Sequence, residues 1–182
     1  EAQLEAEKIM SADKNILKPG SGDPTISNKL LDIILGCYWM TKEVEGLKGE
    51  GMVFENPNSA ITAHDFDLVD FRAKIKVLGT DSPKYKKFEG GIFETSVGRL
   101  LFNSVLPSDY PFINTEINKK KLSGIIDELI QIHGIESIPN IMDKIKEFGF
   151  KYATVSGITW GISDINISKD KDEIIKKTRE EV

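Results

Sequence analysis

Apolar residues recur at the three- and four-residue spacing of an amphipathic helix in several parts of this chain. The most regular pattern begins at Asn118 and is expected to end at Gly134. Its apolar side comprises Leu122, Ile125, Ile126, Leu129, Ile130 and His133. A second helix is predicted after a cap at Ser27 or Asn28. Its apolar positions are Leu30, Leu31, Ile34, Leu35, Tyr38 and Trp39, a broad face that predicts deep burial.

Further helices are predicted where shorter apolar patterns lie between helix-breaking residues. They are one at residues 1–10, one that starts at Thr95 or Ser96 and stops at Pro107, and one from Pro139 to Phe148 that Gly149 closes. The stretch 152–165 is interpreted as a loop or short strands. From Ser168 onward the pattern predicts a charged helix, and its apolar stripe is too thin for that helix to fold unaided.

Strict alternation of apolar and polar residues predicts one strand clearly. The apolar positions are Phe71, Ala73, Ile75 and Val77, and the polar positions between them are Arg72, Lys74 and Lys76. Shorter strands are predicted at 52–54 and at 92–93. The fold class is therefore α+β, with several amphipathic helices and a small, mostly antiparallel β element.

Composition bounds the functional classes but selects none. The 182 residues suit one domain, or one domain with an appendage, and 40% hydrophobic with 29% charged residues is ordinary for a globular protein. A net charge of -5 does not favour a free-standing protein held to nucleic acid by its overall charge. Any contact with nucleic acid must then be local, for example at the basic face of the 71–77 strand, although most such faces are simply solvated.

Cysteine and histidine usage argues against disulfide and zinc chemistry. Cys37 has no partner for an internal disulfide, and His64 and His133 are too few and too far apart for a zinc set. These features, with no membrane-length apolar run, favour a cytoplasmic protein. The chain starts at Glu1 with no visible leader, so we expect it to be an internal piece of a longer protein.

Individual motifs are weak on their own. The carboxylates of Asp65 and Asp67 have a spacing that suits magnesium, although alternating acids on a loop are usually solvated. Lys119, Lys120 and Lys121 begin a predicted helix, where positive charge opposes the helix dipole. That placement invites a functional explanation, and a solvated basic turn is an equal alternative. The Lys84, Lys86 and Lys87 cluster is consistent either with a phosphate contact or with a hairpin tip.

Several stretches, taken in order, resemble the beta-prime subunit of bacterial RNA polymerase. They are EAQLEA at 1–6, NILKP at 15–19, GDP at 22–24, LGCYWMT at 35–41, KGEGMV at 48–53, TSVGR at 95–99, NKKKL at 118–122, and GFKYA at 149–153 leading to Ser156-Gly157. Each is unspecific alone, and the order makes the set strong. The resemblance spans nearly the whole chain and is weakest at about 55–70 and 80–91.

The resemblance implies a role in DNA-directed RNA polymerase, a nucleotidyltransferase. Residues 1–165 would form the pore domain, which walls the secondary channel for nucleoside triphosphate entry and for extrusion of the 3′ RNA end. Residues 166–182 would start a rim helix of the funnel. The catalytic Mg²⁺ would be held by aspartates upstream of Glu1, so the fragment itself would have no catalytic or metal-binding residue and would be inactive. The best candidates to line the channel are Arg99, Lys119, Lys120 and Lys121.

The implied partners are the beta, alpha, omega and sigma subunits, with DNA, RNA and nucleoside triphosphates in the assembled enzyme. Factors that enter the secondary channel are further possible partners, and no membrane contact is expected. Two alternatives remain open from the sequence. One is a free-standing α+β module whose basic strand face binds an acidic partner. The other is a split-gene polymerase subunit that assembles with a separate chain carrying the aspartates.

Overall fold

The computed structural model describes residues 1–25, 31–88, 90–165 and 168–181. Its elements are α1 (Ala2–Glu5), the π-helical turn η1 (Ala6–Met10), the 3₁₀ turn η2 (Ala12–Lys14), α3 (Leu31–Thr41), β1 (Val53–Phe54), α4 (Pro57–Asp65), β2 (Ile75–Leu78), the 3₁₀ segment η3 (Pro83–Phe88), β3 (Ile92–Thr95), α5 (Val97–Val105), α6 (Lys119–His133), the 3₁₀ turn η4 (Ile135–Ser137), α7 (Ile138–Ser156), the 3₁₀ turn η5 (Ile162–Asp164) and α8 (Lys171–Glu181). The predicted α+β class is confirmed.

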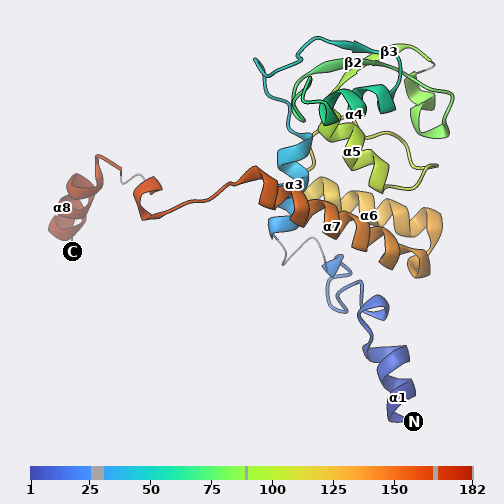
Figure 1. Ribbon diagram of the computed structural model, residues 1–182. Coiled ribbons are helices and arrows are strands. Elements are labelled where there is room, and N and C mark those ends of the chain that lie inside the picture. The colour runs from blue at the N-terminus through green and yellow to red at the C-terminus, as the bar shows by residue number, and fades with distance from the viewer. Residues whose placement is uncertain (26–30, 89, 166–167, 182) are drawn as a thin grey trace.

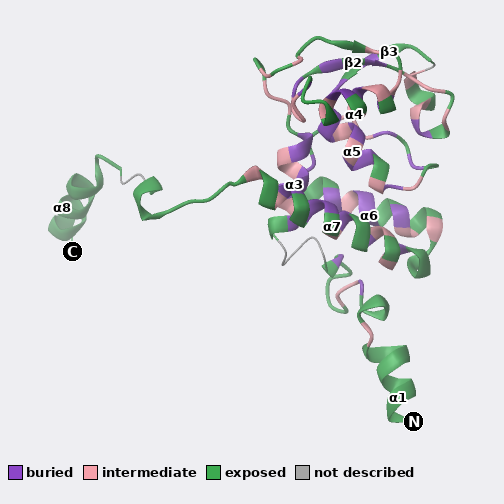
Figure 2. Ribbon diagram, viewed as in Figure 1, coloured by how far each residue is buried: buried purple, intermediate pink, exposed green. Residues whose placement is uncertain are grey.

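The folded body has a sheet part and a helical part, with α5 between them (Figure 1). The sheet part contains β1, β2, β3 and α4, and the helical part contains α3, α6 and α7 (Figure 1). Each part has its own cluster of buried apolar side chains. Val97 and Leu100 of α5 belong to the sheet cluster, whereas Phe102 belongs to the helical cluster. Figure 2 shows burial concentrated in these two parts. Helix α5 therefore joins the two cores.

The sheet has the order β1-β2-β3. Strand β1 is parallel to β2, and β3 pairs antiparallel with β2 from Ile75↔Thr95 to Leu78↔Ile92, so the longer ladder is antiparallel, as predicted. Ile75 and Val77 are buried, as the alternation predicts. The predicted start at residue 71 is wrong, because the Asp70 carboxylate accepts a hydrogen bond from the Arg72 amide at 2.9 Å and holds a turn before β2.

Helix α3 exists as predicted, but it buries a different face. Its buried residues are Ile33, Gly36, Cys37, Met40 and Thr41, whereas Leu31 is 66% exposed. A β-carbon at Gly36 would lie 1.9 Å from the carbonyl oxygen of Gly149 on α7, so the two helices touch through their glycine backbones. This close contact selects the small-residue face of α3. The predicted cap at Ser27 or Asn28 lies outside the described residues.

Helix α7 is longer than predicted, and this corrects two expectations. It does not close at Gly149 but continues to Ser156, where Gly157 follows with a left-handed φ of 60°. Residues 152–156 are therefore helical rather than a loop, and only the 3₁₀ turn η5 interrupts the irregular stretch 157–165. A β-carbon at Gly149 would lie 2.6 Å from the carbonyl oxygen of Ile33. Gly149 thus permits a helix crossing instead of ending a helix.

Local capping explains where α4, α5 and α6 begin. The Ser96 hydroxyl accepts from the Arg99 amide, and the Asn118 side chain accepts from the Lys121 amide, so the two predicted starts are confirmed. Gly134 ends α6, also as predicted. Helix α4 was not expected. Asn56 and Ser59 form a reciprocal capping box around Pro57, which favours a helix start at that position.

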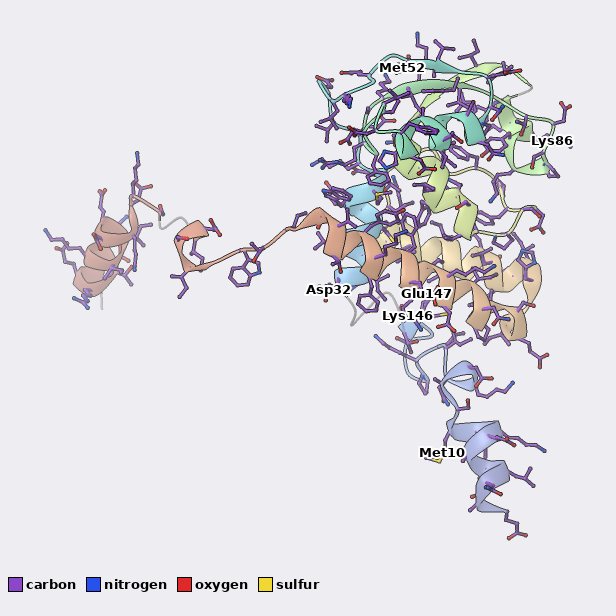
Figure 3. The ribbon with its side chains drawn as sticks, viewed as in Figure 1. Met10, Asp32, Met52, Lys86, Lys146 and Glu147 are labelled. Carbon is purple, nitrogen blue, oxygen red and sulfur yellow. The ribbon has the colours of Figure 1, made fainter. Side chains whose placement is uncertain are left out.

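The two ends of the chain contribute little to the core. Helical turns α1 and η1 match the predicted helix at 1–10, and neither buries a residue. Met10 is labelled on this end in Figure 3 and is 77% exposed. Helix α8 forms as predicted and also buries no residue. In the described part of the chain, no helix is long and apolar enough to cross a membrane.

Candidate functional site

The basic turn, defined as Lys119, Lys120 and Lys121, forms the start of α6, and all three residues are exposed. Unpaired N–H groups and the helix dipole already make a helix start positive. Three ammonium groups add to that potential. Among the described residues, no ion pair joins them to a carboxylate. The turn therefore presents uncompensated positive charge to solvent.

Arg99 lies in the first turn of α5, and its side chain is only 11% exposed. Its Nε donates to the carbonyl oxygen of Thr41 at 2.9 Å. Its Nη1 donates to Glu43 Oε1 at 2.5 Å and to Asn114 Oδ1 at 3.2 Å. Burial lowers the pKa of the Arg99 guanidinium, and the Glu43 carboxylate opposes that decrease. Arg99 is therefore a paired, structural cation, unlike the basic turn.

The segment 113–117, which leads into α6, is held by polar side chains from neighbouring elements. Asn103 of α5 binds Ile113 twice, since its Nδ2 donates to the Ile113 carbonyl and its Oδ1 accepts from the Ile113 amide, both at 2.8 Å. Asn114 donates to the Glu94 carbonyl on β3 at 2.7 Å. These contacts attach the segment to α5 and to the sheet.

Thr41, the last residue of α3, connects this network to the basic turn. Its hydroxyl donates to the Cys37 carbonyl at 2.7 Å and accepts from the Ile117 amide at 2.8 Å. Its own carbonyl is the acceptor for Arg99. Ile117 directly precedes the Asn118 cap of α6. The structure thus links Arg99 and the three lysines, all sequence-predicted candidates, through Thr41, which sequence reasoning missed.

Residues 15–165 match the family model described as RNA polymerase Rpb1, domain 3. The chain belongs to this family. Relatives described as DNA-directed RNA polymerase subunit beta′ match it in Sulfurihydrogenibium sp. (39% identity over 100% of the chain), Thermobifida fusca (38% over 97%) and Bacteroides fragilis (38% over 100%). The chain spans 11%, 14% and 13% of these relatives, respectively. The resemblance found in the sequence is confirmed.

Not every basic residue of this Rpb1 domain 3 chain is available to a ligand. Lys84 is buried, and its Nζ donates to the backbone carbonyls of Asn103 and Leu106 at the end of α5. Burial lowers the pKa of the Lys84 ammonium. Lys84 therefore does not contribute to a phosphate contact. Lys86 and Lys87 remain exposed on η3, and Figure 3 shows Lys86 at the sheet end of the molecule, away from α7.

The basic strand face is partly neutralised by β3. Lys74 Nζ lies 2.6 Å from a carboxylate oxygen of Glu94, and Lys76 Nζ lies 4.0 Å from the other. The hydrogen bond and charge of Glu94 raise the pKa of Lys74, and those of Lys74 lower the pKa of Glu94. Two lysines thus share one carboxylate, which weakens the case for an acidic partner at this face.

Asp65 and Asp67 have different surroundings in the structure, and Asp67 has a cationic partner. Asp65 ends α4, while Asp67 has a φ of 55° and pairs with Lys48 at 2.9 Å. Among residues 1–25, 31–88, 90–165 and 168–181, no group of three or more His, Cys, Asp or Glu side chains is placed to hold a metal ion. The described residues therefore do not supply a ligand set of three or more side chains for the catalytic Mg²⁺ of a polymerase.

Proposed function

We propose that this chain is part of the beta-prime subunit of a DNA-directed RNA polymerase, where it walls the secondary channel. Residues 1–165 serve as the pore domain and residues 166–182 as the start of a funnel rim helix. Nucleotide addition takes place outside the chain, on aspartates that hold Mg²⁺. The chain itself supplies no catalytic residue. Its partners are the beta, alpha, omega and sigma subunits and, within the enzyme, DNA, RNA and nucleoside triphosphates.

The observation that carries this proposal is the uncompensated basic turn at the start of α6. Triphosphates and RNA both carry dense negative charge. A positive region on a channel wall raises their local concentration without contributing a reacting group. Lysine suits this role because its mobile ammonium attracts phosphate without fixing one geometry. Arg99 offers no free charge to a phosphate, because it pairs with Glu43. It supports the site indirectly, through its hydrogen bond to the Thr41 carbonyl.

The test is charge reversal of Lys119 and Lys120 to glutamate in the assembled polymerase. We expect the KM for nucleoside triphosphates to rise by about three- to tenfold while kcat stays within about twofold, because the loss is in encounter rather than chemistry. Backtracking and the response to transcript-cleavage factors should change as well. Misfolding is a poor explanation for such a loss, because acidic residues at a helix start are stabilising.

The matched control reverses Lys86 and Lys87, two exposed lysines on η3. This control removes the same amount of charge from another surface and should leave the KM unchanged. Raising the salt concentration should reduce the difference between wild type and the Lys119/Lys120 variant, because salt screens exposed charges. Unchanged nucleotide use, backtracking and cleavage-factor response in that variant would overturn the proposed channel role.

A further inference from the structure

We propose that Thr41 is a positioning residue that sets the location of the basic turn. This inference rests on the proposed function and adds the residue through which the fold controls that function. The hydrogen-bond partners of Thr41 include none of the three lysines of the turn. It acts through the amide of Ile117, and only Asn118 lies between Ile117 and Lys119.

The contact is buried on both sides, which makes it strong and specific. Thr41 is 1% exposed and Ile117 is 0% exposed. A buried backbone N–H without an acceptor is costly, because water cannot replace the lost hydrogen bond. The chain at Ile117 therefore stays where the Thr41 hydroxyl can receive its hydrogen.

Thr41 is itself held in place on three sides. Its hydroxyl hydrogen is committed to the Cys37 carbonyl, which leaves an oxygen lone pair aimed at Ile117. Its carbonyl is bound by Arg99 of α5. Helix α3, which ends at Thr41, packs extensively on α7. The hydrogen bond from Ile117 thus attaches the chain just before the basic turn to a helix that packs in the helical core.

The other side-chain hydrogen bonds that hold the segment 113–117 do not reach Ile117. Asn103 holds Ile113, and Asn114 is held by Arg99 and by its own bond to the Glu94 carbonyl. These contacts lie three or more residues before Ile117. The last attachment before α6 is therefore made at Ile117, whose side chain is buried in the helical cluster and whose amide is held by Thr41.

Two substitutions separate the hydrogen bond from packing. Thr41→Val keeps the branched shape and removes the hydroxyl, whereas Thr41→Ser keeps the hydroxyl and removes a methyl group. Thr154→Val is the matched control, because Thr154 makes the same bond to a carbonyl four residues back, at 2.9 Å, but lies exposed on α7. All three are made in the assembled polymerase.

The first readout is hydrogen exchange of the 113–122 backbone, measured by mass spectrometry. Thr41→Val should speed exchange in this segment by about tenfold or more, because the Ile117 amide loses its acceptor and the segment opens more often. Thr41→Ser and Thr154→Val should resemble wild type. Unaltered exchange in Thr41→Val overturns the positioning role whatever the activity shows.

The second readout is the division between KM and kcat. Thr41→Val should raise the KM for triphosphates by about twofold to fivefold with kcat little changed, and Thr41→Ser should restore it. In a background in which Lys119, Lys120 and Lys121 are all replaced by glutamine, Thr41→Val should have no further effect on KM, because none of the residues that it positions then attracts phosphate. An additive effect in that background overturns the inference while leaving the channel role intact. If replacement of the lysines alone leaves the KM for triphosphates unchanged, the channel role is overturned and, with it, this functional part of the inference.

Discussion

Gly36 on α3 and Gly149 on α7 face each other with no side chain between them, and a β-carbon at Gly36 would lie 1.9 Å from the Gly149 carbonyl oxygen. Backbone atoms cannot move aside as a flexible side chain can. We therefore predict that Gly36→Ala lowers the free energy of unfolding by about 3 kcal/mol, at the severe end of overpacking. Urea unfolding of the purified chain measures this value.

The control for Gly36→Ala is Gly124→Ala in α6. A β-carbon at Gly124 would meet no atom within 4 Å, and Gly124 has no positive φ. Alanine is the better helix former, so this change should raise stability by about 0.5–1 kcal/mol. Equal effects at the two positions would contradict the close crossing of α3 and α7.

The Arg99–Glu43 pair should matter to folding more than the exposed pair on the sheet. Arg99→Met leaves the Glu43 carboxylate and the Thr41 carbonyl without their partner, at a cost of about 1–3 kcal/mol. Lys74→Met removes an exposed partner of Glu94, and its expected cost is smaller because solvent screens this pair. Thermal unfolding of both variants checks the order, and a larger loss in Lys74→Met would contradict it.

The Cys37 thiol should be unreactive in the folded chain. It is 0% exposed, and burial raises the pKa of its thiol to about 12, so the reactive thiolate is scarce at neutral pH. We expect no maleimide labelling at pH 7.5 without denaturant and complete labelling in urea, measured by intact mass. Rapid labelling of the folded chain would contradict the placement of α3 in the core.

Tyr110 should make the folded state sensitive to alkali. Burial and a 2.6 Å hydrogen bond to Glu128 raise the pKa of its phenol above the usual 10.0. Above pH 10 the unfolded chain loses this proton before the folded chain does, so the unfolded state binds fewer protons and stability falls as pH rises. Below pH 10 the contribution is complete.

Tyr110→Phe is the variant that isolates this effect, because it keeps the ring and removes the titrating group. Its stability should fall less steeply above pH 10 than that of wild type, by up to about 1.4 kcal/mol per pH unit. Tyr85 and Tyr152, whose pKa values are also raised by burial, will leave a residual slope. Chemical unfolding at several pH values tests this, and identical slopes would contradict it.

Replacing a lysine at the start of α6 with an acidic residue should raise the stability of the fold while it impairs the proposed channel function. Lys119→Glu replaces an unfavourable charge with a favourable one at the positive end of the helix, and we expect it to stabilise the isolated chain by about 0.3–1 kcal/mol at low salt. The gain should shrink at high salt. A loss of stability would mean that Lys119 has a structural partner in the folded chain.

Helix starts were predictable because their signals are local. Asn118 and Ser96 cap α6 and α5 through side chains that reach an amide three residues ahead, and the sequence shows both. The helix α4 had the same kind of signal at Asn56 and Ser59, but its few large apolar residues hid it. The end of α7 was misplaced because Gly149 suits either a helix stop or a close crossing. What lies opposite Gly149 decides between them, and that residue is distant in sequence.

The polymerase family, the α+β class and the basic turn could all be predicted from the sequence, because each rests on residue order or on neighbours within a helical turn. The pairing of Arg99, the burial of Lys84 and the hydrogen bond of Thr41 just before α6 became visible only in the folded structure. Thr41 lies 58 residues from Arg99 and 76 residues from Ile117. Such contacts exist only after the helices have packed, and burial then turns ordinary polar residues into specific attachments.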